Sequence, residues 1–173
     1  MPCKDDYVTY STFGVCLVED IRFIKFQPGL PGRDYYVLKP IRQDSASIFV
    51  PADNETLVAR IRPVLSPEEI DRLIADVRDQ SLPWIHDRKQ RLDAFQGILS
   101  RGDTRELLLM ARCLYLKSKE SPKGLPMADM QILKKVQEMI EQGFSFSLNR
   151  SDQQVGGYIR EKLGLTAELC APT

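Results

Sequence analysis

The sequence predicts an α+β protein in which a small antiparallel β domain, residues 1–64, precedes an all-α domain, residues 65–173, of about four to five helices. In the first sixty residues, β-branched and aromatic residues recur in short runs that turn-forming residues separate. From Ser66 onward, helix-capping patterns and apolar residues three to four positions apart replace these runs. About four or five short strands in so short a segment favour a small barrel or a strongly bent sheet.

The predicted strands follow one another between chain-breaking residues. We expect them at residues 7–10, 15–26, 35–38, 47–50 and, interrupted by Pro63, 58–65. Residues 11–14 supply a turn, and residues 27–32, which contain two prolines and two glycines, predict an exposed loop between strands.

The predicted helices have recognisable starts and stops. Ser66 and Glu69 form a capping-box pattern with Pro67 at the first helical position, so we expect a linking helix over residues 66–79. Further helices are expected over residues 87–101, 103–116, 127–144 and 151–163, the last stopped by Gly164. The helix after Pro126 is expected to bury Met130, Leu133, Val136, Ile140 and Phe144.

The composition is that of an ordinary globular protein, with 43% hydrophobic and 28% charged residues among 173. It excludes a mostly disordered chain and a strongly basic one. The longest aliphatic stretch is too short to span a bilayer, and the amino-terminal residues lack the pattern of a secretory signal. Four scattered cysteines predict unpaired thiols in a reducing compartment rather than disulfides or a zinc site. We therefore expect a cytoplasmic protein.

The formal net charge of zero conceals an asymmetry along the chain. Residues 1–83 carry 10 basic and 13 acidic side chains, whereas residues 84–173 carry 14 basic and 11 acidic ones. Within the second half, residues 84–135 hold 11 basic and 6 acidic side chains. The carboxyl-terminal half is therefore the one suited to a polyanion.

Catalysis has little support in the sequence. His86 is the only histidine, and its neighbour Asp87 does not share its face on a helix, so the two do not form an oriented acid–base pair. Nucleophile-elbow, phosphate-loop, dinucleotide and zinc-protease motifs are absent. We expect no enzyme activity, no catalytic residue, no metal, no cofactor and no small-molecule substrate.

Trp84, the only tryptophan, follows Pro83 near the predicted boundary between the domains. One interpretation is an aromatic anchor that fastens the second domain onto the first. The other is an apolar wedge for a DNA base step, flanked by the phosphate-binding cations Arg88, Lys89 and Arg91. Arg88 and Arg91 are three positions apart and share one helix face. Because cations at a helix start oppose the helix dipole, they favour an external anion.

A series of short segments in a fixed order carries a resemblance to a known family. These segments are DYVTY (6–10), FGVCLVEDI (13–21), YYVLKP (35–40), IFVPADN (48–54), WIHDRKQR (84–91), SRGD (100–103), LLLMARCLYL (107–116) and LKKV (133–136). In order and spacing they resemble the CarD/CdnL family of bacterial transcription regulators, over roughly residues 7–148.

The resemblance implies that the amino-terminal domain is a Tudor-like barrel that binds the β subunit of RNA polymerase through a strand edge. The same module occurs in transcription-repair coupling factor. The corresponding positions here are Lys25, Ile48, Phe49 and Val50. Some members carry arginines at the position of Phe49 and near Ile24 and Lys25, so docking here is expected to rely more on backbone pairing and apolar contact, or on a different local surface of the partner. From the residues alone, a barrel with closed edges is an equally good interpretation.

The resemblance further implies that the helical domain binds promoter DNA at the upstream edge of the melted bubble and stabilises the open complex. Trp84 takes the place of the family's minor-groove wedge, and Arg88, Lys89 and Arg91 hold the DNA backbone. An alternative hypothesis is a protein-interaction adaptor with a Tudor-like barrel, in which Trp84 packs between the domains and no DNA is bound.

Overall fold

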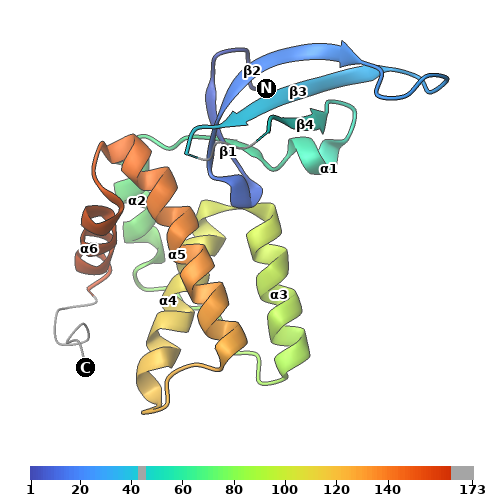
Figure 1. The fold of residues 1–173 in the computed structure, drawn as a ribbon. Helices are drawn as coiled ribbons and strands as arrows, with labels where there is room; N and C mark the ends of the chain where they lie inside the picture. Colours follow the sequence, from blue (N-terminus) through green and yellow to red (C-terminus); the bar gives the residue numbers. More distant parts are fainter. Residues whose placement is uncertain (43–45, 165–173) are drawn as a thin grey trace. The chain divides into compact units, whose positions relative to one another are not determined.

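The computed structural model describes residues 1–42 and 46–164. The chain divides into two compact units, Met1–Val64 and Leu65–Thr173, and each is described by itself (Figure 1). The first is built around a β-sheet and the second from helices, so the predicted α+β class is confirmed. None of the helices in the described part of the chain is long and apolar enough to cross a membrane.

The first unit contains one antiparallel sheet with the strand order β4-β3-β2-β1-β5. Its strands are β1 (Tyr7–Tyr10), β2 (Val15–Ile24), β3 (Arg33–Pro40), β4 (Ile48–Pro51) and β5 (Ile61–Pro63). Within residues 1–42 and 46–64, β4 and β5 each pair with a single neighbour. The sheet is therefore open in the described residues, and the predicted barrel is not confirmed.

The core of this unit lies on one face of the sheet. Because side chains alternate between the two faces of a strand, Tyr36 and Leu38 of β3 lie on the same face. There they pack with Val50 of β4 and with Val8, Val18 and Ile61. A bulge between Val18 and Asp20 shifts the register of the long β2–β3 hairpin.

The last predicted strand begins later than its sequence suggests. Residues Glu55–Val58 form the short helix α1, because the Asn54 side chain accepts a hydrogen bond of 3.1 Å from the Leu57 N–H and caps the helix. The chain joins the sheet only at Ile61, so the prediction that the strand starts at Val58 is wrong.

The second unit contains α2 (Pro67–Val77), α3 (Arg88–Arg101), α4 (Thr104–Glu120), α5 (Met127–Leu148) and α6 (Asp152–Lys162). The capping box of Ser66 and Glu69 is present, with both reciprocal hydrogen bonds formed. Asp87 caps α3 by accepting from the Gln90 N–H, and Gly102 ends that helix at a φ of 65°.

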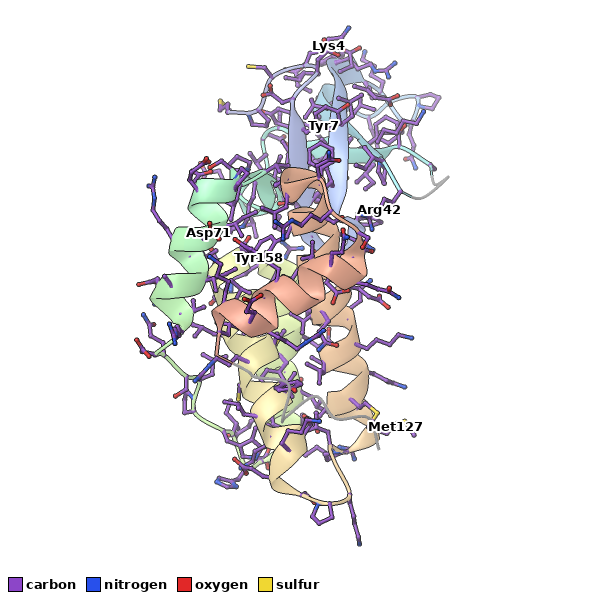
Figure 2. All side chains as sticks on the ribbon, turned by 90° about the vertical axis from the view of Figure 1, so that its left-hand side faces the viewer. Lys4, Tyr7, Arg42, Asp71, Met127 and Tyr158 are labelled. Carbon is purple, nitrogen blue, oxygen red and sulfur yellow. The ribbon has the colours of Figure 1, made fainter. Side chains whose placement is uncertain are left out.

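The apolar faces of these helices surround one core, in which α4 and α5 lie side by side (Figure 1). Its most buried members include Ile70, Ile74, Met110, Leu114, Val136 and Val155. The Tyr158 hydroxyl of α6 donates a hydrogen bond to Asp71 of α2, which ties the two helices together beside this core (Figure 2). Burial and this bond raise the pKa of Tyr158 to about 12.

The buried stripe of α5 differs from its prediction at one position. Met130 is 50% exposed, so the expectation that it lies in the core is wrong. The inward-facing series runs through Asp129, Ile132, Val136 and Ile140 at the helical spacing of three to four residues. A charged residue therefore occupies the place that a hydrophobic pattern assigned to its methionine neighbour.

Candidate functional site

Trp84 lies in the segment between α2 and α3 and is half-buried against the core of the helical unit. The Arg91 guanidinium of α3 is 4.5 Å from the centre of the indole ring, and the Lys117 ammonium of α4 is 5.3 Å from it. Two cations from different helices thus lie over the same aromatic ring, an arrangement that the ring quadrupole favours.

Arg91 connects this tryptophan to a buried carboxylate. Its Nε and Nη2 donate to Asp129 Oδ1 and Oδ2 at 2.8 and 2.9 Å, a bidentate pair. Its Nη1 donates to the carbonyl oxygens of Ile85 at 3.0 Å and His86 at 3.3 Å. Arg91 is 5% exposed and Asp129 is 0% exposed, and the hydrogen bonds to Asp129 raise the pKa of Arg91. The guanidinium is thus fully engaged inside the unit.

This arrangement corrects the prediction that Arg88 and Arg91 share one exposed face. Arg88 and Lys89 are exposed, whereas Arg91 points into the unit. The sequence argument expected an external anion near the start of α3, but Asp129 supplies that anion internally. Arg91 is therefore not positioned as a phosphate ligand, and it supports Trp84 instead.

Lys117 and Asp129 are the residues of this site that sequence reasoning missed. Neither lies near Trp84 in the chain, and α4 and α5 bring them there. The Lys117 ammonium also pairs with Glu120 at 2.6 Å. The basic excess of residues 84–135 was the one signal for Lys117, and no pattern in the sequence marked Asp129 as a partner of Arg91.

The second candidate site is the free edge of β4. The Ala52 N–H donates to the Asp34 carbonyl at 2.9 Å, and Val50 lies opposite Tyr36. By the alternation of an antiparallel ladder, the backbone N–H and C=O of Phe49 point away from β3. No strand of residues 1–42 and 46–64 pairs on that side. This edge offers backbone groups to an added strand.

The three predicted residues of β4 are not equivalent. The Val50 side chain is 1% exposed and belongs to the core, Ile48 is half-buried on the same face, and Phe49 is 40% exposed on the other. Of these three residues, Phe49 therefore offers the most side-chain surface to a partner. Lys25 is exposed just beyond the end of β2, where its side chain and that of Phe23 cover Gly32.

An exposed aromatic cluster adjoins the β4 edge and was not predicted. The Phe26 ring packs edge-on against Tyr35 at 5.1 Å and against Phe49 at 5.4 Å, measured between ring centres. Phe26 is 59% exposed. Exposed aromatic rings beside unpaired backbone groups are typical of a protein-binding surface rather than of a catalytic one.

Metal sites in proteins usually bring several histidine, cysteine or acidic side chains together. Within residues 1–42 and 46–164, no group of three or more histidine, cysteine or acidic side chains is placed to hold a metal ion. His86 is exposed, and its carbonyl oxygen, rather than its ring, takes part in the Arg91 cluster. Burial raises the pKa of the Cys16 thiol to about 12, which leaves it unreactive at neutral pH.

Residues 4–65 match the family model described as the CarD-like/TRCF RID domain. The chain thus carries a CarD-like/TRCF RID module at residues 4–65, which include the sheet, the β4 edge and Lys25. This module is a protein-interaction domain, not a catalytic one, and it indicates a role related to transcription with RNA polymerase as the partner. No curated protein matches the chain. The helices α2–α6 lie outside the matched residues.

Proposed function

We propose that this chain, which carries a CarD-like/TRCF RID module, is a bacterial transcription regulator that stabilises the open promoter complex. Its sheet unit is a Tudor-like module that binds the β subunit of RNA polymerase. Its helical unit binds promoter DNA at the upstream edge of the melted bubble. It acts in the cytoplasm without a cofactor. The family match of residues 4–65 is the observation that carries the polymerase-binding part of this proposal, and the half-buried Trp84 beside exposed cations supports the DNA-binding part.

The polymerase-binding surface is the β4 edge. The outward-facing backbone of Phe49 pairs with a strand of the β subunit, and the exposed Phe26 and Phe49 rings cover apolar side chains beside it. Lys25, at the end of β2, adds one cation to this surface. Ile48 and Val50 contribute through the core, because their side chains fix the strand that presents Phe49.

The DNA-binding surface is centred on Trp84. A wedge that opens a base step needs an exposed apolar part and a rigid support behind it. Trp84 is half-buried, with Arg91 as its support, and the exposed Arg88 and Lys89 in the first turn of α3 hold DNA phosphates beside it. The proposal thus keeps Trp84, Arg88 and Lys89 as DNA ligands and gives Arg91 a supporting role.

Such a protein shifts the promoter equilibrium because it binds melted DNA better than closed DNA. Inserting an aromatic ring costs less at a step that is already unstacked. A few phosphate contacts give only weak binding to free DNA, roughly in the range of non-specific affinities of 10⁻⁴–10⁻⁶ M or weaker. Attachment to the polymerase compensates by raising the effective concentration at the promoter to about the millimolar range.

The test is the lifetime of open complexes formed with Trp84→Ala. Loss of an aromatic contact to a base costs about 1–3 kcal/mol, so we expect a lifetime at least about fivefold shorter than with the wild-type protein. Trp84→Phe, which keeps an aromatic wedge, is the matched control and is expected to retain most of the effect. Binding to RNA polymerase is measured in parallel and is expected to be unchanged.

A wild-type lifetime with Trp84→Ala, at unchanged polymerase binding, would contradict the wedge. It would favour the adaptor hypothesis, in which the sheet unit binds a protein and the helical unit binds no DNA. The two cations over the indole, Arg91 and Lys117, belong to its own helical unit and give the proposed wedge a support there.

A further inference from the structure

We propose that the buried pair of Asp129 and Arg91 is a positioning device that fixes the orientation of Trp84 for DNA. This inference rests on the proposed function, because it assigns the pair a role in the same site. Neither residue touches DNA. Each acts through the segment 84–86, which carries the wedge.

The Arg91 side chain connects three parts of the helical unit. Arg91 projects from the first turn of α3, binds Asp129 in the first turn of α5, and donates to the carbonyl oxygens of Ile85 and His86. Its guanidinium also lies over the Trp84 ring at 4.5 Å. One rigid, planar group therefore fixes both the tryptophan ring and the backbone that follows it.

The segment that carries Trp84 needs such support because residues 81–86 form neither helix nor strand. The side chains of neighbouring helices bind its backbone instead. Arg112 of α4 donates to the Gln80 carbonyl at 2.8 Å, just before the segment, and the Cys113 thiol lies 3.7 Å from the Leu82 carbonyl. At the other end, Arg91 binds the carbonyls of Ile85 and His86. Trp84 lies between these two attachments.

The pair does more here than fill space. Position 129 begins the inward-facing series of α5, and apolar side chains occupy positions 132, 136 and 140 of that series. Replacing a buried ion pair by well-packed apolar residues is often neutral or stabilising. An apolar residue at position 91, however, cannot donate hydrogen bonds to the carbonyl oxygens of Ile85 and His86. What the ion pair adds is therefore a fixed conformation around Trp84.

The proposal is tested with the full-length double variant Arg91→Met/Asp129→Leu, which replaces the pair by apolar side chains. Because Trp84 is the only tryptophan, its fluorescence reports the site directly. We expect wild-type circular dichroism, a larger amplitude of fast indole motion in time-resolved anisotropy, and stronger quenching by acrylamide. With RNA polymerase, we expect an open-complex lifetime at least about fivefold shorter than wild type.

A second variant, Arg91→Lys, keeps a cation opposite Asp129 but lacks the planar fork. It is expected to increase the indole motion and the acrylamide quenching of Trp84 in the same assays. If the double variant does not fold, this variant tests the positioning role in its place. Anisotropy and quenching equal to wild type in a folded variant would overturn the positioning role. So would a wild-type lifetime in a variant with a mobile indole, provided that Trp84→Ala shortens the lifetime.

If Trp84→Ala itself leaves the lifetime unchanged, the proposed function fails. The anisotropy and quenching of the free protein then still decide whether the pair orients the indole. The two failures are therefore distinguishable.

Discussion

Asp129→Asn is a substitution for which the structure predicts a large loss of stability. It removes one charge at nearly constant volume and leaves the Arg91 guanidinium, 5% exposed, without its counter-ion. Removing one partner of a buried ion pair costs about 3–5 kcal/mol. The asparagine oxygen still accepts one of the two hydrogen bonds that now measure 2.8 and 2.9 Å. We therefore expect the lower end, about 3 kcal/mol.

Urea unfolding followed by Trp84 fluorescence measures this loss in the full chain. The indole packs on the core of the helical unit, so its signal reports the unit that holds the pair. For a slope of about 2 kcal/mol per M, a loss of about 3 kcal/mol lowers the unfolding midpoint by about 1.5 M urea. Because the pair is buried, added salt should change this difference little.

Asp93→Asn is the matched control, because Asp93 is an exposed residue of the same helix as Arg91. A surface substitution of this kind is expected to stay within about 0.5 kcal/mol of wild type. If Asp129→Asn lowers the midpoint no further than Asp93→Asn does, the buried charge is not held by its partner, and the argument from burial is refuted.

Two further predictions concern the sheet unit. Phe49→Pro should weaken binding to RNA polymerase in a pull-down far more than Phe49→Ala, because proline also removes the outward-facing N–H; equal losses would contradict backbone pairing at β4. Because burial raises the pKa of Cys16 from 9.0 to about 12, its thiolate fraction at pH 8 is about a thousandfold below that of an ordinary thiol. Labelling with a disulfide reagent, read by mass spectrometry, should therefore modify the exposed Cys3 and spare Cys16. For the same reason, the contribution of Cys16 to stability is complete below pH 9.0 and falls as the pH rises toward 12.

The local chemistry of the helix ends was predictable from the sequence. Ser66 with Glu69, Asp87 and Gly102 all act as caps in the structure, because a cap depends on residues three or four positions apart. The same holds for strands β1–β4, whose β-branched and aromatic runs lie between chain breakers. Asn54 was the exception, because the short helix that it caps, Glu55–Val58, was not predicted and ends at the first residue of the predicted strand.

The support of the candidate site was not predictable, because it depends on side chains that meet only in the folded chain. The Arg91–Asp129 pair joins residues 38 positions apart, and the apolar stripe of α5 gave no sign that Asp129, rather than Met130, faces inward. A local sequence pattern was equally unable to predict whether the sheet closes into a barrel. Edge pairing in a sheet is decided by strand register and curvature, which single strands do not encode.

Residues 84–135 carry 11 basic and 6 acidic side chains, but several of these cations bind carboxylates of the helical unit and, under the proposed function, do not contact DNA phosphates. Arg91 is engaged with Asp129, Arg101 with Glu106, Arg105 with Asp76 and Lys117 with Glu120. In the proposed complex, the exposed Arg88 and Lys89 beside Trp84 neutralise only about two phosphates, too few for tight binding to free DNA at physiological salt. Under the proposed function, selectivity for the promoter must then come from the sheet unit's attachment to RNA polymerase. The oriented indole adds a preference for melted over closed DNA, which phosphate contacts alone do not supply.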